Sequence, residues 1–253
     1  MDEMAQVGAW LWQKGWAERN AGNISINITR VVDADLAAGR HEALEDRLVE
    51  LAGASFAITA AGSRLRDLGR DPQGTVCLLR VDETGQGYYV LGPAPAGIRP
   101  TSELASHLRL HRTYARQGQP AVAVLHTHPT ELVALTHLPQ FQNSAVLSRL
   151  LWSMHPEAVV FLAEGVAFAP FTVPGTAAMG ALTAELAAQH RVVVWEKHGC
   201  LAVAPGITEA FDLIDTANKA AQLYLLACSS GQPPQGLSEA QITAIRAAFG
   251  IRP

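Results

Sequence analysis

The sequence predicts an α/β fold in which helices cover a mixed or antiparallel β-sheet. Apolar runs of strand length alternate along the chain with segments of helical periodicity, which is the pattern of a layered α/β protein. The tetrapeptide ETGQ separates the apolar runs at 77–82 and 87–92, and this spacing is typical of a β-hairpin. A hairpin places antiparallel neighbours in the sheet, so a purely parallel, doubly wound sheet is not expected.

The elements follow in order from local patterns. Strands are expected where apolar and β-branched residues gather between turn residues, at 24–29, 55–59, 77–82, 87–92, 121–128, 158–163, 192–196 and 200–205. Helices are expected where helical periodicity or helix start signals occur, at 3–19, 60–68, 101–117, 129–137, 144–153, 176–190, 208–228 and 239–249. Residues 43–54 fit either a helix or a loop.

Composition limits the class of protein. A chain of 253 residues fits one domain spanning 1–253, and its net charge of -4 gives no electrostatic reason to expect nucleic acid as a partner. The three cysteines, Cys77, Cys200 and Cys228, show no paired spacing, which favours reduced thiols in the cytoplasm. No signal pattern opens the chain and no uninterrupted apolar run reaches about 18 residues, so neither export nor a membrane span is expected.

Three histidines form the main chemical signal. His126 and His128 stand two residues apart in a strand-like run, and His198 lies in an HG turn far along the chain. Side chains at i and i+2 of a strand share a face, so two imidazoles can converge and a turn can bring the third. Three neutral ring nitrogens with a free fourth position are typical of a catalytic zinc site, although cobalt, iron and manganese stay open. The alternative is a pair of hydrogen-bonded histidines at a strand end.

His107 and His111 are a rival pair. They stand four residues apart on the helix expected over 101–117, so both would lie on one helical face. Because arginines are interleaved with them, we expect these two histidines at the surface or at an interface.

Two glutamates are candidate acid–base groups. Glu103 lies in the expected first turn of a helix, where it could complete a capping box or, beside a metal, accept a carbon-bound proton. Glu157 precedes the apolar run at 158–163 and is either a second acid–base group or a solvated charge. Spacing alone does not decide between these alternatives.

Possible anion contacts complete the set. Helix starts and turns bind phosphate through unpaired N–H groups and hydroxyls, and the alternative is ordinary turn and cap chemistry. The candidates are Asn20, Asn23, Gly62, Thr101 and Ser102.

Other catalytic chemistries are less favoured. The chain has neither a GxGxxG nor a GxxxxGK[ST] pattern, and it has no GxSxG elbow. None of the three lysines (Lys14, Lys197, Lys219) stands in an apolar strand centre, where burial would tune a Schiff-base lysine.

Taken together, these segments resemble the class II aldolase/adducin family over most of the chain. The motifs PTSE, HxH and HG in this order carry the resemblance, together with FAITAAGSRLRD (56–67) and VDETGQGYYVL (81–91). Within the family, KGWAERNAGNIS (14–25), PFTVPGT (170–176) and LIDTANKAAQ (213–222) resemble the branch that acts on rhamnulose phosphate.

The resemblance implies a fold, a reaction and an assembly. The fold would be a three-layer α/β/α arrangement around a central mixed, largely antiparallel sheet. The reaction would be metal-dependent cleavage of L-rhamnulose 1-phosphate to dihydroxyacetone phosphate and L-lactaldehyde through a metal-stabilised enediolate. The family enzymes are usually cyclic tetramers with the active site near subunit interfaces, so a homotetramer is expected.

The resemblance also assigns roles to residues of this chain. It implies that His126, His128 and His198 hold one divalent ion per subunit, with zinc favoured, and that Glu103 is the catalytic acid–base. Glu157 matches a second acidic residue that assists proton transfer. Asn23, Gly62, Thr101 and Ser102 match phosphate-binding positions, and Asn20 matches a further substrate-binding asparagine.

Two departures and several rival functions remain. Ala61 stands where the family often carries a hydroxyl, for which Ser63 could compensate, and the chain ends early, at IRP. A fuculose or ribulose phosphate aldolase, a sugar-phosphate 4-epimerase, a thio-sugar phosphate dehydratase and a non-catalytic adducin-like domain are the alternatives. The last of these would be expected to lack the metal ligands, which are present here.

Overall fold

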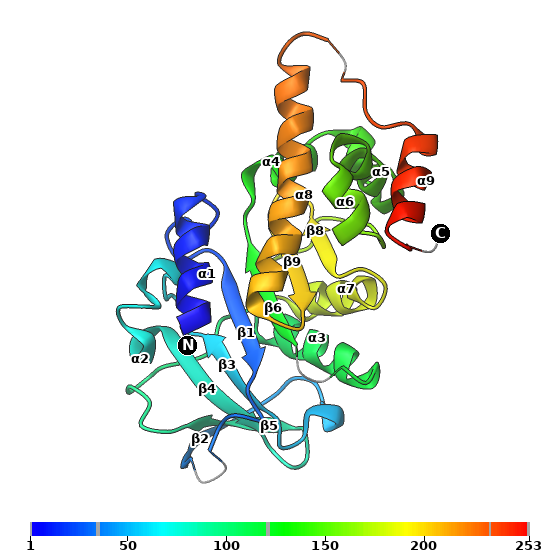
Figure 1. The fold of residues 1–253 in the computed structure, drawn as a ribbon. Helices are drawn as coiled ribbons and strands as arrows, with labels where there is room; N and C mark the ends of the chain where they lie inside the picture. Colours follow the sequence, from blue (N-terminus) through cyan, green and yellow to red (C-terminus); the bar gives the residue numbers. More distant parts are fainter. Residues whose placement is uncertain (1, 34–35, 120–121, 233, 252–253) are drawn as a thin grey trace.

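Nine strands form one sheet in the computed structural model, which describes residues 2–33, 36–119, 122–232 and 234–251 (Figure 1). The strand order is β2-β5-β4-β3-β1-β6-β9-β8-β7, and every neighbouring pair is antiparallel except the parallel pair β7 and β8. The strands are β1 (Asn23–Asn27), β2 (Ala38–Ala43), β3 (Ser55–Thr59), β4 (Val76–Val81), β5 (Gly87–Leu91), β6 (Ala123–Thr127), β7 (Ala167–Ala169), β8 (Val192–Trp195) and β9 (Gly199–Ala204).

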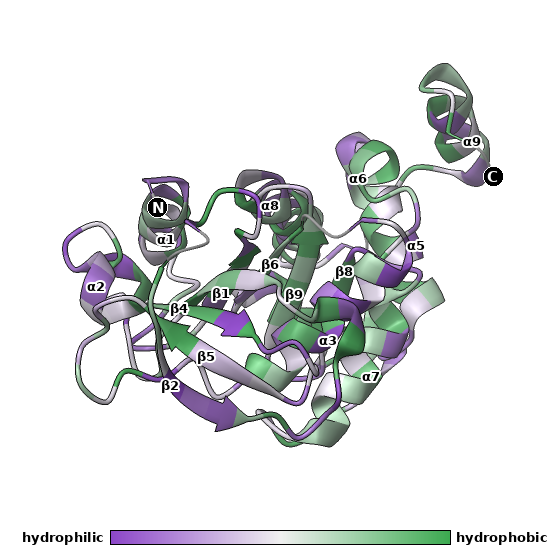
Figure 2. Ribbon diagram, turned by 90° about the horizontal axis from the view of Figure 1, so that it is seen from below, coloured by the Kyte–Doolittle hydropathy of each residue, from purple (hydrophilic) through white to green (hydrophobic). Residues whose placement is uncertain are grey.

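The helices lie in two layers over this sheet. The α-helices are α1 (Asp2–Gln13), α2 (Pro72–Thr75), α3 (Leu104–Arg116), α4 (Thr130–Leu135), α5 (Ser144–Met154), α6 (Pro156–Phe161), α7 (Ala177–Ala187), α8 (Ile207–Cys228) and α9 (Glu239–Ala248), and the short 3-10 helices are η1 (Val49–Leu51), η2 (Leu65–Asp67) and η3 (Pro139–Phe141). Figure 2 shows α1 and α8 on one face of the sheet and α3 and α7 on the other. The expected three-layer α/β/α fold with a largely antiparallel sheet is confirmed.

Strand alternation explains the two layers. In β6, Ala123 and Leu125 pack in the core beneath α1 and α8, whereas Val124 packs with Leu110 of α3 and Met179 of α7. Successive strand residues point to opposite faces, so a strand covered on both sides is apolar at nearly every position. The continuous apolar runs of the sequence are therefore the central strands of the sheet.

Two strands were not predicted: β7, which has only three residues, and β2, which is polar. β2 lies at the edge of the sheet with five of its six residues exposed, and it contains Arg40, His41 and Glu42 (Figure 2). Charged residues protect an edge strand from pairing with other chains, and they also hide the strand from an apolar pattern search. The segment expected to be a helix or loop over 43–54 holds the end of β2 and the 3-10 helix η1.

The hairpin prediction is confirmed, and three other expectations are wrong. β4 and β5 pair antiparallel around residues 82–86. The strand expected over 158–163 is the helix α6, which starts with Pro156 at its first position, because a short apolar run fits a buried strand or a helix equally well. The N-terminal helix ends at Gln13, not at residue 19, since Gly15 follows with a φ of +74°. The region 60–68 forms a turn and the 3-10 helix η2 in place of an α-helix.

Two further expectations concern the ends and the membrane. Residue 121, at the start of the strand expected over 121–128, and the end of the chain at 252–253 lie outside the described residues. Within the part of the chain that the structure describes, no helix combines the length and the apolar character needed to cross a membrane.

Candidate active site

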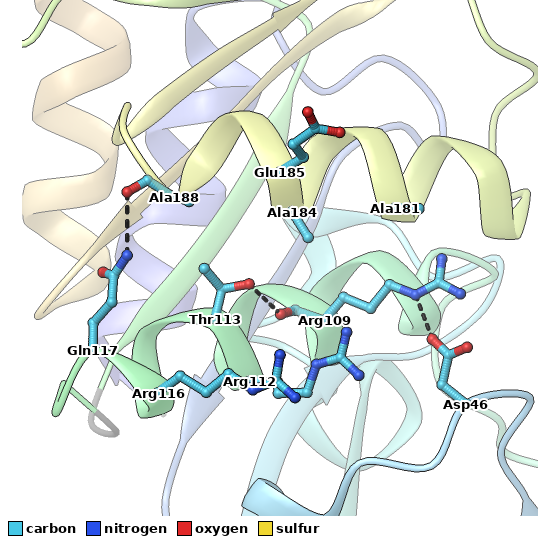
Figure 3. A pocket seen from close by; sticks show the side chains of 10 residues that line it. All are labelled: Asp46, Arg109, Arg112, Thr113, Arg116, Gln117, Ala181, Ala184, Glu185 and Ala188. Carbon is cyan, nitrogen blue, oxygen red and sulfur yellow. Dashed lines mark hydrogen bonds and ion pairs between the residues drawn. The ribbon is translucent and has the colours of Figure 1, made fainter.

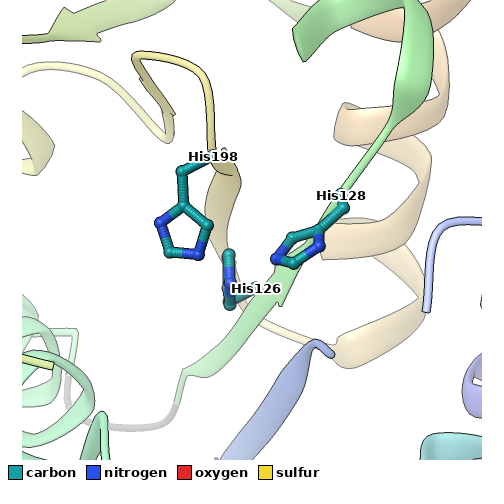
Figure 4. A group of neighbouring side chains, drawn as sticks. All are labelled: His126, His128 and His198. Atoms are coloured by element: carbon teal, nitrogen blue, oxygen red, sulfur yellow. The ribbon is translucent and has the colours of Figure 1, made fainter. Parts of the chain in front are cut away.

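Three imidazole rings meet at the end of β6 (Figure 4). His126 is the fourth residue of β6, His128 follows the strand, and His198 lies in the turn between β8 and β9. The ring centroids are 5.0 to 5.1 Å apart, and one potential ligand atom from each ring lies within 4.8 Å of the others. We call these residues the histidine cluster. The structure therefore brings together the three residues that the sequence selected, with His126 buried and with His128 and His198 half-buried.

The HG turn explains how β9 approaches so closely. A Cβ atom on Gly199 would lie 2.6 Å from the carbonyl oxygen of Thr127 and 2.8 Å from a ring carbon of His128, which no real side chain tolerates. Lys197 takes a left-handed backbone with a φ of 57°, and its amide donates to Thr136 Oγ1 at 2.8 Å. The glycine and the bonded turn thus place His198 over the strand that carries His126.

Hydrogen bonds on the outer ring nitrogens orient two of the rings. His126 Nδ1 donates to the carbonyl oxygen of Cys200 at 2.9 Å, and His128 Nδ1 donates to the Glu18 carboxylate at 2.7 Å. Metal-bound histidines usually have such a partner on the nitrogen that does not face the metal. The buried Nε2 of His128 has no partner among the described residues, as expected of a nitrogen that awaits an ion. The residues therefore fit a metal.

Burial also favours the protonation state that a metal requires. Burial lowers the pKa of His126 well below its usual value, and charge on His128 or His198 would lower it further, against a smaller opposing effect of the Cys200 carbonyl. Burial likewise lowers the pKa of His198, with His128 as the next cause. Neutral imidazoles offer a free lone pair at neutral pH, which is the form that binds a cation.

Glu103 lies beside the histidine cluster. It is the residue that precedes α3, and its side chain makes no capping hydrogen bond, so the capping-box alternative is wrong. Its Oε2 accepts a hydrogen bond from Asn23 Nδ2 at 2.9 Å and lies 3.9 Å from His126 Nε2. The side chain is buried, with 8% of the residue exposed. A carboxylate held at this distance from a nitrogen of the histidine cluster could exchange a proton with a molecule bound there.

Three of the expected anion contacts lie close together. The amide of Thr101 donates to the carbonyl of Thr59 at 2.9 Å, the amide of Ala61 donates to the carbonyl of Arg99 at 2.8 Å, and Ala60 bridges to Pro100. These bonds place Gly62 beside the start of α3. Asn23 pairs with His126 across β1 and β6, and the amide of the next residue bonds to the Thr59 hydroxyl at 3.1 Å. Asn23, Gly62 and Thr101 thus lie together next to the histidine cluster, and we call this group the polar corner.

The other anion candidates differ in exposure. Asn20 and Ser102 are exposed, whereas Asn23 and Thr101 are buried. Gly62 has a φ of +74°, which makes glycine the favoured residue, and the space beyond its Cα is open. The Ser63 hydroxyl donates to the Ala60 carbonyl at 2.7 Å, so in this conformation its proton does not replace the hydroxyl missing at Ala61.

The structure does not join Glu157 to the histidine cluster within one chain. It lies in the first turn of α6, its side chain is 55% exposed, and its carboxylate pairs with His155 Nδ1 at 2.8 Å.

The expectation that His107 and His111 lie at the surface or an interface is wrong, because both are fully buried between α3 and β1. Glu18, the partner of His128, was not selected from the sequence, although it stands in the segment KGWAERN.

A second polar region lies between α3 and α7 (Figure 3). A cavity of about 580 Å³ is lined by Arg109, Arg112 and Arg116 of α3 and by small residues of α7. Arg109 pairs with Asp46 and with the carbonyl of Ala177, and Arg116 pairs with Glu50 at 2.6 Å. We call this the arginine cavity. Figures 3 and 4 show that the two polar regions share no labelled residue.

Comparison with known proteins adds to this geometry. The family model described as the Class II Aldolase and Adducin N-terminal domain matches residues 2–225. A rhamnulose-1-phosphate aldolase of Bacteroides thetaiotaomicron is 37% identical over 257 residues, covering 99% of this chain and 94% of that protein. A protein of the same name from Pectobacterium atrosepticum is also 37% identical, covering 99% of this chain and 93% of its own length.

Solved structures share the fold. A sugar-phosphate aldolase from Thermotoga maritima matches with a TM-score of 0.79 and 32% identity, covering 92% of this chain and 96% of that one. An L-fuculose-1-phosphate aldolase from Thermus thermophilus matches with a TM-score of 0.58 over 92% of this chain and 96% of that one, and at 24% identity it shows the fold alone. Since the family match covers most of the chain and the relatives align almost end to end, this chain belongs to the class II aldolase and adducin family and is an aldolase.

Proposed function

We propose that this aldolase cleaves L-rhamnulose 1-phosphate into dihydroxyacetone phosphate and L-lactaldehyde with the help of one divalent ion. The observation that carries the proposal is the meeting of three imidazoles beside the buried carboxylate of Glu103. The choice of sugar rests on relatives named for rhamnulose 1-phosphate that align with 99% of this chain.

His126, His128 and His198 would hold the ion. Three imidazole nitrogens favour zinc, and the carbonyl and carboxylate behind His126 and His128 keep the ligand nitrogens turned inward. When bound, the cation would withdraw charge from the carbonyl and hydroxyl oxygens of the ketose.

Glu103 would act as the acid–base on carbon. In the cleavage direction, the Glu103 carboxylate would take the proton of the C4 hydroxyl as the C3–C4 bond breaks, so that C4 becomes the aldehyde carbon and the electron pair of that bond moves to C3 and the C2 carbonyl oxygen. Glu103 in its protonated form then returns a proton to C3, which completes dihydroxyacetone phosphate, and in synthesis the carboxylate removes that proton again. The hydrogen bond from Asn23 fixes the carboxylate during both steps.

The polar corner beside the cluster would bind the phosphate. Asn23, Gly62, Thr101 and Ser102 offer amide, hydroxyl and backbone N–H donors there, and Asn20 would contact the substrate from the exposed turn before β1. Since Ala61 lacks a hydroxyl and Ser63 donates to a carbonyl, the backbone N–H groups near Gly62 would carry more of the phosphate contact.

Glu157 would serve as the second acid only across a subunit interface. Its carboxylate is exposed on α6 and has no contact with the histidine cluster among the described residues of one chain. The homotetramer that we expect, with sites near its interfaces, would bring Glu157 of one subunit to the site of another.

We further propose that residues 1–253 form one domain, which the single sheet supports, and that the enzyme is cytoplasmic, which the free cysteines support.

Product analysis with three substrates tests the proposal. The zinc-loaded protein is incubated separately with L-rhamnulose 1-phosphate, L-fuculose 1-phosphate and L-ribulose 5-phosphate. Triose phosphate released from the two 1-phosphates is coupled to a reductase, and the products of the 5-phosphate, whose cleavage between C3 and C4 would give unphosphorylated dihydroxyacetone, are identified by chromatography. We expect triose phosphate and L-lactaldehyde from the rhamnulose ester, with the highest kcat/KM of the three. Preference for another sugar would overturn the substrate, and isomerised sugar without aldehyde would indicate an epimerase. Protein stripped with a chelator is the control.

A further inference from the structure

A chain of side-chain hydrogen bonds leads from Glu103 into the interior. Asn23 Nδ2 donates to Glu103 at 2.9 Å, and the Oδ1 of the same amide contacts His107 Nε2. The other nitrogen of His107, Nδ1, lies 2.7 Å from Ser25 Oγ, and Ser25 Oγ lies 2.8 Å from His111 Nε2. The chain therefore joins the proposed acid–base group to four residues of β1 and α3.

While the Glu103 carboxylate is ionised and accepts from the Asn23 amide nitrogen, the chain has one consistent arrangement of protons. The amide oxygen of Asn23 can only accept, so Nε2 of His107 must carry a proton. In the neutral ring the Nδ1 of His107 is then an acceptor, and it takes the proton of the Ser25 hydroxyl. Ser25 Oγ in turn accepts from Nε2–H of His111, and the chain ends at His111 Nδ1, a buried nitrogen with no partner among the described residues.

Burial keeps this arrangement in place. His107 and His111 are 0% exposed and Ser25 is 1% exposed. Burial lowers the pKa of His107 to about 4 and that of His111 to about 3, so both rings are neutral at pH 7. Buried polar side chains are costly unless they are hydrogen-bonded, and apolar side chains would fill this space at lower cost. The cost of burying these polar side chains therefore indicates a role beyond packing.

We propose that His107 and Ser25 are positioning residues that hold the Asn23 amide in one orientation and thereby aim the Glu103 carboxylate at the substrate. If the amide rotated by half a turn, its oxygen would face the carboxylate oxygen of Glu103 and its NH₂ group would face the N–H of His107. Both contacts would be repulsive while Glu103 is ionised and Nε2 of His107 carries its proton, so these two groups together select the productive orientation. This inference rests on the proposed acid–base role of Glu103.

Two substitutions of His107 separate positioning from packing. His107→Gln keeps a donor for Asn23 and an acceptor for Ser25, whereas His107→Leu fills the space without either. We expect His107→Leu to lower kcat by about 10- to 100-fold, as is common for residues that orient a reacting group, and His107→Gln to recover most of that loss. Bound metal per chain should stay at the wild-type value in both. Equal kcat in the Leu variant and the wild type, or equal losses in both variants, would overturn the proposal.

A serine pair supplies a second test should His107→Leu fail to fold. Ser25→Ala removes one hydroxyl from the chain, and Ser148→Ala is its matched control, because Ser148 is also buried and makes two hydrogen bonds, with the backbone of Val166. Both changes should lower the temperature of unfolding by a similar amount. We expect only Ser25→Ala to lower kcat, by about tenfold. A kcat equal to that of the control would show that the chain has a packing role alone.

Nitrogen NMR gives a readout that does not depend on turnover. In zinc-loaded protein with ¹⁵N-labelled histidine, His107 should show a protonated Nε2 and an unprotonated Nδ1 at pH 7. The opposite tautomer would refute the proton arrangement. If the wild type cleaves none of the three sugar phosphates, the proposed function fails; if the wild type is active and the variants match it, only this inference fails.

Discussion

The histidine cluster and the arginine cavity are both polar and both adjoin α3. They differ in how many of their polar side-chain atoms have a hydrogen-bond or ion-pair partner within the protein. In the arginine cavity, Arg109 and Arg116 already pair with Asp46 and Glu50. In the histidine cluster, three rings turn toward one point, and the buried Nε2 of His128 has no partner among the residues described. The arginine cavity has a volume of about 580 Å³, whereas the histidine cluster has a ring nitrogen whose lone pair is free to bind a cation.

Polar atoms without a partner in the protein indicate where a ligand can bind. Charges that are matched within the protein stabilise it or orient a helix, and they have little binding energy left for a ligand. Arg112 is the exception in the cavity, since its buried Nε has no partner within the described ranges. The number of polar atoms that lack a partner is therefore a better guide to the proposed active site than the size of a cavity.

The largest expected effect comes from removing a ring of the histidine cluster. His126→Ala should lose the ion and lower kcat/KM by at least about 1000-fold, because a bound cation supplies several kcal/mol of charge stabilisation. Metal content by mass spectrometry and turnover of L-rhamnulose 1-phosphate measure the two losses. A variant that keeps both the ion and the wild-type rate would show that His126 is not needed to bind the metal.

The next effect separates the acid–base group from the metal. Glu103→Gln keeps the size of the side chain and should leave the ion bound, while kcat falls by about 100- to 10,000-fold because the proton acceptor is lost. Glu50→Gln, at the ion-pair partner of Arg116, is the control and should leave kcat unchanged. A fully active Glu103→Gln enzyme would rule out Glu103 as the base.

The pH dependence of stability should also differ between the two regions. The pKa values of His107 and His111 are lowered on folding to about 4 and about 3, so below the unfolded value near 6.5 the unfolded chain binds more protons. The free energy of unfolding should therefore fall as pH falls through this window, by up to about 1.4 kcal/mol per pH unit for each such ring. The hydrogen bond from Arg109 lowers the pKa of Asp46 below its unfolded value of 3.8. The stability that this carboxylate contributes is therefore fully present above pH 3.8 and is lost only in more acidic solution.

Urea unfolding of the metal-free protein at pH 7 and pH 5 measures this difference. His111→Gln should reduce the loss of stability between the two pH values, because one buried ring no longer titrates in the unfolded chain. Asp46→Asn should leave the loss as it is in the wild type. An unchanged loss in His111→Gln would contradict the assignment.

The smallest effect is expected in the arginine cavity itself. Arg112→Ala should change kcat/KM by less than about twofold and the free energy of unfolding by less than about 1 kcal/mol, since a partly exposed arginine with no carboxylate at ion-pair distance among the described residues contributes little. Steady-state kinetics and urea unfolding check both numbers. A loss of activity above tenfold would show that this cavity takes part in the reaction and would reverse the comparison.

Much of the site could be predicted from the sequence because its signals are local. The motif LHTHP places His126 and His128 within a strand-like run, and the glycine after His198 indicates a close approach of backbones. Strand alternation and turn chemistry depend on neighbouring residues, so these features, and the apolar central strands, can be read without coordinates. The resemblance to the family added the role of Glu103.

Other features depended on contacts between distant segments. The polar residues of β2 and the short apolar run of α6 carry no pattern that separates strand from helix or loop. His107 and His111 belong to a helix that also carries three arginines, and only the packing of α3 on β1 shows that the histidines face inward and the arginines face α7. A helical pattern shows that two residues share a face, but not which neighbour that face meets.

The sequence by itself determined the layered α/β class, the hairpin and the three metal-ligating candidates, because each follows from residue types within a few positions of one another. Only the tertiary structure decided that Asn23 bonds to Glu103, that Glu18 orients His128 and that Glu157 lies away from the cluster in one chain. These outcomes depend on how strands and helices far apart in the chain are aligned. That alignment is set by burial of the whole core and not by any local motif.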